Sequence, residues 1–110
     1  MTELRGNVFW NESIPGPEDA ERVETLWAGR RARVERIVST GQSSSEGFWY
    51  DQEEDEWVVL LEGFAVLEYE DGGRAELRRG DWLLIPARCR HRVACTSPDP
   101  PCVWLAFFSD

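Results

Sequence analysis

The chain has 110 residues, enough for one domain with one hydrophobic core and too few for two. Its 12 basic residues face 21 acidic ones, a formal net charge of −9, which argues against nucleic acid or an anionic membrane as a partner. The sequence shows neither a run of about 20 apolar residues nor the apolar segment of a signal peptide. Its cysteines lack the paired spacing of a zinc site, so we expect free thiols and a cytoplasmic location.

The first element that we expect along the chain is a short α-helix within residues 15–29. Pro17 suits a first helical turn, acidic residues follow it, and Gly29 is a typical helix stop. Apolar side chains between Ala20 and Leu26 recur every three residues and would form one narrow stripe.

After this segment the apolar residues recur every second position, which is the period of a β-strand. Short alternating runs follow, separated by turn signals such as Asp71–Gly73 and Gly80–Asp81. Strands at short, regular spacing are typical of an all-β sandwich or barrel. We expect one domain, in which residues 1–36 hold the helix and a first strand and residues 37–110 form the barrel.

Two stretches resemble the paired motifs of the cupin family. In "DEWVVLLEG", Glu56 is followed after six residues by Gly63. In "GDWLLIPARCRH", Gly80 is followed after five residues by Pro86 and after four more by His91. The resemblance extends over residues 37–108. The sequence around the motifs is similar to small bacterial cupin-2 barrels without an assigned activity. It implies a single-domain jelly-roll β-barrel.

The resemblance also implies where a metal ion would bind. Metal-binding cupins use the two histidines of a His-x-His, the glutamate that follows, and the histidine of the second motif. Glu56 and His91 match the last two, but His91 is the only histidine in the chain. Counting back from Glu56 places either Trp49 and Asp51, or Tyr50 and Gln52 with a loop one residue shorter, at the missing positions. The candidate ligands are therefore Asp51, Gln52, Glu56 and His91.

The alternation of the strands gives an independent view of this site. His91 shares one face of "RCRHRVAC" with Cys89, Val93 and Cys95, and three arginines share the other. Because three arginines cannot all face a dry core, His91 is expected to point inward. Glu56 shares a face with two apolar residues of its strand, which predicts that Glu56 and His91 face one another inside the barrel.

The acidic run that begins at Asp51 is expected to serve two purposes. Glu53, Glu54 and Asp55 would lie on a solvated turn, whereas Glu56 and Asp51 would turn inward. Clustered carboxylates in a barrel repel and take up protons, unless a divalent cation or a charged His91 relieves the repulsion. A set of Asp, Gln, Glu and His suits Mn²⁺, Fe²⁺, Mg²⁺ or Zn²⁺.

The alternative to a metal site is a purely structural role for these residues. His91 could be a hydrogen-bonded core residue, and Glu56 could accept a hydrogen bond from His91 or Trp82. The expected function is binding of a small polar molecule in the barrel, with a divalent metal (Fe, Mn, Zn or Mg) as the candidate cofactor. The alternatives are a metal-dependent dioxygenase or isomerase and a metal-free sensor or carrier. The residues expected to line the pocket are Trp49, Tyr50, Trp82 and Cys89.

The outer face of the same strand predicts an assembly. Trp57, Val59 and Leu61 would face away from the cavity, and burying each is worth roughly 1.5–3 kcal/mol. We therefore expect a homodimer to which residues 57–61 or the N-terminal residues 8–10 contribute.

Overall fold

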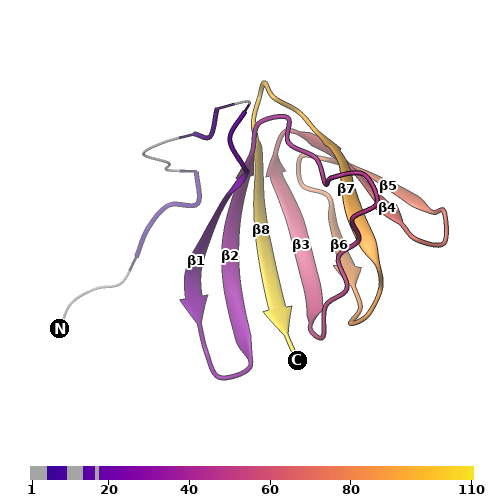
Figure 1. Cartoon of the computed structure of the whole chain (residues 1–110). Coiled ribbons are helices and arrows are strands. Elements are labelled where there is room, and N and C mark those ends of the chain that lie inside the picture. Colours follow the sequence, from indigo (N-terminus) through magenta and orange to yellow (C-terminus); the bar gives the residue numbers. More distant parts are fainter. Residues whose placement is uncertain (1–4, 10–13, 17) are drawn as a thin grey trace.

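The computed structural model describes residues 5–9, 14–16 and 18–110. Within these residues the chain forms strands and no helix (Figure 1). The strands are β1 (Arg22–Ala28), β2 (Ala32–Ser39), β3 (Asp55–Glu62), β4 (Phe64–Tyr69), β5 (Arg74–Arg78), β6 (Trp82–Ile85), β7 (His91–Thr96) and β8 (Cys102–Ser109). In this part of the chain no helix exists that is long and apolar enough to cross a membrane.

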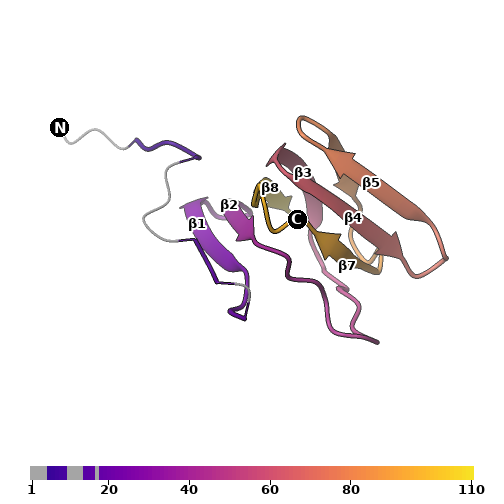
Figure 2. The same cartoon turned by 90° about the horizontal axis from the view of Figure 1, so that it is seen from above.

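The strands form two antiparallel sheets, as expected for a jelly-roll barrel. The larger sheet has the order β1-β2-β8-β3-β6 and the smaller the order β5-β4-β7. Figure 2 shows that β4, β5 and β7 lie over the β3 side of the larger sheet, while β1 and β2 extend beyond them. The all-β prediction is confirmed, and the smaller sheet covers only part of the larger one.

The predicted N-terminal helix is wrong, because Arg22–Ala28 forms the edge strand β1. This strand pairs with β2 along its length, with an irregularity between Thr25 and Trp27. Val23, Thr25 and Trp27 are β-branched or aromatic and favour a strand. A helix this short is marginal without tertiary packing, whereas a neighbouring strand satisfies the backbone groups directly. Pro17 lies outside the described residues.

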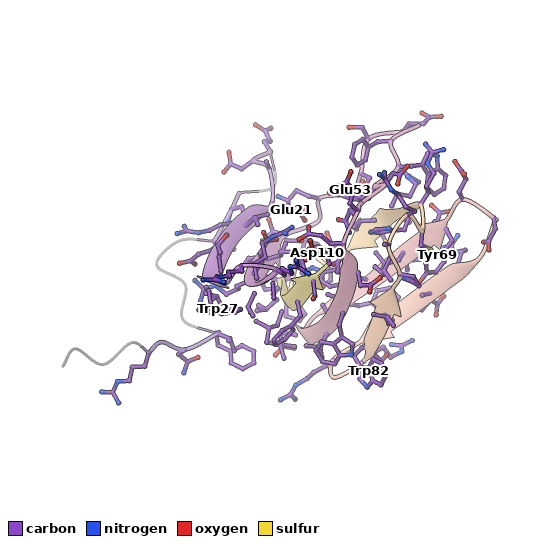
Figure 3. The ribbon with its side chains drawn as sticks, turned by 90° about the horizontal axis from the view of Figure 1, so that it is seen from below. Glu21, Trp27, Glu53, Tyr69, Trp82 and Asp110 are labelled. Atoms are coloured by element: carbon purple, nitrogen blue, oxygen red, sulfur yellow. The ribbon has the colours of Figure 1, made fainter. Side chains whose placement is uncertain are left out.

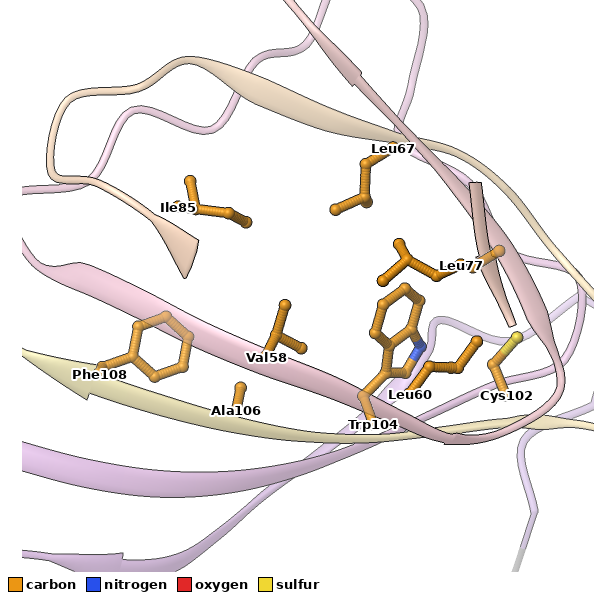
Figure 4. Packing of buried hydrophobic residues seen from close by; sticks show 10 residues of the cluster. Val58, Leu60, Leu67, Leu77, Ile85, Cys102, Trp104, Ala106 and Phe108 are labelled. Carbon is orange, nitrogen blue, oxygen red and sulfur yellow. The ribbon is translucent and has the colours of Figure 1, made fainter. Parts of the chain in front are cut away.

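The hydrophobic core lies between the two sheets and is densest at one end of the barrel (Figure 4). Leu60 of β3, Leu77 of β5 and Cys102 of β8 meet there and are fully or almost fully buried. We call the part of the core around Leu60, Leu77 and Cys102 the packed end. Alternate residues of β3 and β8 supply much of it, since successive side chains of a strand point to opposite faces.

Gly63 makes the bend between β3 and β4. Its φ angle is +91°, which L side chains rarely adopt, and a Cβ atom there would lie 2.9 Å from the Cα of Cys102. The motif glycine is therefore required by the backbone of the packed end.

A β-bulge in β7 changes which of its residues face inward. Leu67 of β4 pairs with Val93, but Val66 pairs with Cys95, so Ala94 is an extra residue. His91 and Val93 keep the inner side, whereas Cys95 is exposed. The prediction that Cys95 shares a face with His91 is wrong, because strict alternation takes no account of a bulge.

Candidate functional site

A cavity of about 180 Å³ lies at the other end of the barrel from the packed end. Core residues such as Val58, Leu67 and Trp104 form its apolar wall. The polar side chains that line it are Glu21, Arg33, Glu35, Tyr50, Gln52, Glu56 and His91. We call these seven residues the polar end.

Glu56 and His91 face each other in this cavity, as the alternation of their strands predicts. Glu56 is the second residue of β3 and is 8% exposed, and His91 is the first residue of β7 and is 5% exposed. Glu56 Oε1 lies 3.8 Å from His91 Nε2, which is too far for a hydrogen bond.

The position of the His91 ring is fixed by its backbone surroundings. Its Nδ1 lies 2.9 Å from the carbonyl oxygen of Cys89, and a carbonyl only accepts, so Nδ1 carries the proton and donates. Its backbone exchanges two hydrogen bonds with Tyr50, and the two rings stack with centroids 5.3 Å apart. In the neutral ring, Nε2 is therefore an acceptor that points into the cavity.

Burial shifts the pKa values of Glu56 and His91 in opposite directions, and in both groups it favours the neutral form. Burial raises the pKa of Glu56 to about 6, an effect that Glu35 reinforces and that a hydrogen bond from Gln52 partly offsets. Burial lowers the pKa of His91, partly offset by its bond to the Cys89 carbonyl. Near neutral pH, His91 is neutral and Glu56 is largely ionised.

The structure selects the shorter of the two loop alignments for the remaining cupin ligand positions. Tyr50 and Gln52 line the cavity, and Gln52 Nε2 donates to Glu56 Oε1 at 3.2 Å. Asp51 instead turns outward, where its carboxylate lies 3.2 Å from Arg88. The expectation that Asp51 points inward is wrong, because the exposed guanidinium of Arg88 holds it outside.

The side chains at these positions do not fit a cupin metal centre. Burial and the nearby Glu21 and Glu56 raise the pKa of Tyr50, so its phenol keeps its proton. The amide of Gln52 directs its N–H group at Glu56. Glu56 and His91 are the two strong metal ligands left. The described residues contain no group of three or more His, Cys, Asp or Glu that could hold a metal ion.

The other acids of the run 51–56 have specific partners, so their turn is more than a solvated loop. Glu53 pairs with Arg88 at 3.2 Å, and Glu54 accepts hydrogen bonds from Arg33. Asp55 accepts a hydrogen bond from the backbone of Ala87 at 2.8 Å. These contacts tie the loop before β3 to the rim of the barrel and orient Glu56 inward.

Of the four residues expected to line the pocket, the structure places Tyr50 there. Trp82 is 61% exposed and lies at the surface of the molecule (Figure 3). It packs against Trp57 on the outer face, with ring centroids 5.6 Å apart. Trp82 pairs with Val59, an outward residue of β3, so it can neither line the cavity nor donate to Glu56. Trp49 and Cys89 are partly buried outside the cavity lining.

Sequence reasoning missed Glu21, Arg33 and Glu35 as parts of the site. The alternation of β2 does put Arg33 and Glu35 on one face with Ile37. Because both faces of β2 mix polar and apolar residues, periodicity alone could not tell which face is inside.

Comparison with known proteins agrees with this architecture. The family model of the cupin domain matches residues 35–108. A provisionally named mannose-6-phosphate isomerase from Ralstonia eutropha JMP134 is 43% identical, with a TM-score of 0.87, and the match covers 96% of this chain and 97% of that one. A comparison with curated proteins gave no match.

Two more distant structures share the fold alone. A Cupin 2 conserved barrel domain protein from Salinispora arenicola CNS-205 is 23% identical, with a TM-score of 0.68 and coverage of 100% and 90% of the two chains. KdgF from Halomonas sp. is 18% identical, with a TM-score of 0.70 and coverage of 89% and 87%. The resemblance noted in the two motifs is confirmed, and the chain belongs to the cupin family.

Proposed function

We propose that the protein binds a small polar molecule at the polar end of its barrel and does so without a resident metal ion. The observation that supports this is a cavity into which Glu56 and His91 both point, nearly buried and without a hydrogen bond between them. Each side chain uses part of its hydrogen-bonding capacity elsewhere, Glu56 with Gln52 and His91 with the Cys89 carbonyl, and presents the rest to the cavity. A cavity that served folding alone would gain stability from apolar residues at these positions.

The size and lining of the cavity support a metabolite rather than a large ligand. Its volume of about 180 Å³ is below the ~300–1,000 Å³ of sites for drug-sized molecules. Trp104 and Phe108 supply an apolar wall, and the polar side chains converge opposite it. Such a lining can hold a compact molecule by its polar groups and shield its carbon skeleton.

Two measurements on protein prepared without a histidine tag test this proposal. Elemental analysis should show no stoichiometric metal. A screen of small polar metabolites by nuclear magnetic resonance should find compounds that shift the His91 signals of the protein. Glu56→Gln should weaken these binders at least tenfold, whereas Glu76→Gln, an exposed glutamate of β5, should not. Stoichiometric Fe or Mn that is needed for binding would contradict the metal-free site and favour a metalloenzyme.

The 43% identical relative makes a sugar isomerase the second candidate function. The Glu56 carboxylate, whose pKa is raised to about 6, is a base at the cavity surface, and such a group can move a proton between adjacent carbons. Incubation with mannose 6-phosphate, followed by an assay for the isomeric ketose phosphate, tests this directly. We expect no turnover, and turnover that Glu56→Gln abolishes would make the isomerase the function.

We also propose that the chain forms a homodimer through the outer face of the larger sheet. One row of paired residues crosses all five strands of that face: Trp27, Val34, Phe107, Trp57 and Leu84. Trp27, Phe107 and Leu84 are exposed. An apolar row of this extent is a liability in water unless another surface covers it.

The N-terminal segment covers a different part of this face. Arg36 donates to the carbonyl oxygens of Asn7 and Val8, at 3.2 and 3.4 Å, beside the apolar row. Trp10, which was expected at the interface, lies outside the described residues. Light scattering should give about twice the 12.7 kDa of one chain, and Trp57→Glu should reduce that mass. A monomer at micromolar concentration would show that the dimer is wrong.

A further inference from the structure

The polar end brings two hydrogen-bond acceptors, His91 Nε2 and the carboxylate of Glu56, within 3.8 Å of each other. Nε2 of His91 is an acceptor because Nδ1 donates to the Cys89 carbonyl. The carboxylate of Glu56 is an acceptor that receives one bond, from Gln52. Among the described residues nothing donates to Nε2, and the 3.8 Å gap to Glu56 is too long for a direct bond. A ligand group that donates to both atoms would therefore be held by two hydrogen bonds.

A primary ammonium group suits this pair of acceptors well. It carries three N–H donors and a positive charge, so it can donate to Nε2 and to the carboxylate at the same time. Two acceptors 3.8 Å apart can each lie at an ordinary hydrogen-bond distance from one nitrogen placed between them. A neutral hydroxyl has one proton and satisfies one of them, and an ionised phosphate offers acceptors alone.

The charges around the cavity favour the same class of ligand. Glu21 and Glu35 line it together with Glu56. Among the residues that the structure describes, the one guanidinium there is that of Arg33, which is already bound to Glu35 and Glu54. The chain contains no lysine that could add a second cation. Carboxylates that line a low-dielectric cleft attract cations and repel anions.

A second hollow, next to the cavity, extends this acidic lining outward. Its volume is about 360 Å³, and it shares Glu21 and Tyr50 with the cavity. Glu18 and Asp19 also line it. A ligand that enters by this side meets carboxylates before it reaches Glu56, which disfavours a phosphorylated molecule at the approach as well as at the site.

We infer that the natural ligand is a small primary amine whose ammonium group sits between Glu56 and Nε2 of His91. This inference rests on the proposed function of binding a small polar molecule. It departs from the sugar phosphate in the name of the 43% identical relative, because the cavity of this chain offers a phosphate no free cation among its described residues.

Three probes that differ in one group test the inference: mannosamine, mannose and mannose 6-phosphate. Titration followed by the ¹⁵N signals of His91 and the backbone should show mannosamine binding at least tenfold tighter than mannose, and mannose 6-phosphate binding weakest. Glu56→Gln should remove the advantage of the amine while leaving weak mannose binding, and Glu76→Gln should change neither. Ethanolamine, a smaller amine, should shift the same signals.

The possible failures are distinguishable. If mannose or mannose 6-phosphate binds as tightly as mannosamine, the amine inference is wrong and the proposed function stands. If Glu56→Gln leaves the preference for mannosamine intact, the ammonium group lies elsewhere and the inference is wrong. If none of the four compounds changes a signal at millimolar concentration, both the inference and the proposed function are contradicted.

Discussion

The packed end and the polar end of the barrel are built on the same strand faces and yet have opposite chemistry. On β3, Leu60 at the packed end and Glu56 at the polar end are four residues apart on one inward face. Leu60 is 0% exposed among apolar neighbours, whereas Glu56 is nearly buried among charged ones. One strand can therefore stabilise the fold at one end and bind a ligand at the other. Substitutions at the two ends should separate stability from binding.

Truncation at the packed end should have the largest effect on stability. Leu60→Ala removes a fully buried side chain and leaves a cavity, which costs about 2–5 kcal/mol. Urea unfolding should report this loss, and the folded fraction should bind ligand as the original protein does. A loss below about 1 kcal/mol would mean that this end is not closely packed.

Gly63→Ala should also destabilise the packed end without touching the cavity. The positive φ angle alone costs about 1–3 kcal/mol for a residue with a Cβ atom. The backbone around Cys102 must also shift, since the new atom would lie 2.9 Å from its Cα. Thermal unfolding should show a lower midpoint, with Gly72→Ala as the matched control, since it has a similar φ angle and open space around it. Equal losses in the two variants would show that the contact with Cys102 adds nothing.

At the polar end, Glu56→Gln should stabilise the protein at neutral pH. The pKa of Glu56 rises from 4.5 to about 6 on folding, so folding favours its protonated form. That contribution is complete below pH 4.5 and is lost as the pH rises through 6, a change of about 2 kcal/mol. Above pH 7 the variant should therefore be about 2 kcal/mol more stable than the original protein.

The pH dependence of that difference supplies the control. It should shrink towards zero below pH 4.5, where Glu56 is protonated in both states. His91, whose lowered pKa makes a contribution of opposite sign, is present in both proteins and largely cancels. A difference that is constant with pH would show that the titration of Glu56 is not its cause.

The smallest effect is expected from an ion pair on the outer surface. Arg90 pairs with Glu70 at 2.6 Å, and both side chains are nearly half exposed. Solvent and salt screen such pairs, so Arg90→Gln should change stability by about 0–1 kcal/mol and leave ligand binding unchanged. A larger loss of stability would mean that solvent does not screen this ion pair.

The sequence allowed the barrel and the two central site residues to be predicted, for physical reasons that also explain what it missed. Glycine turns and period-two strands are local signals, and the parity of β3 and β7 brought Glu56 and His91 together. The N-terminal segment was misassigned because its stripe suited a helix, and only pairing with β2 decides the matter. The inward position of Arg33 could not be predicted, because both faces of β2 carry charge.

Two further errors had causes outside any local pattern. The bulge at Ala94 reversed the orientation of Cys95, and such an extra residue leaves no periodic signal. Asp51 was placed inward by counting alone, whereas its partner Arg88 is remote in sequence and meets it only in the folded chain.

The protonation state of His91 tests the account most directly. Because the chain has one histidine, long-range ¹⁵N–¹H spectra contain a single imidazole. The account predicts a neutral ring with its proton on Nδ1 and a lone pair on Nε2, titrating below the ordinary value of 6.5, since burial lowers its pKa. A proton on Nε2, or a pKa at or above 6.5, would contradict the arrangement of two acceptors at the polar end.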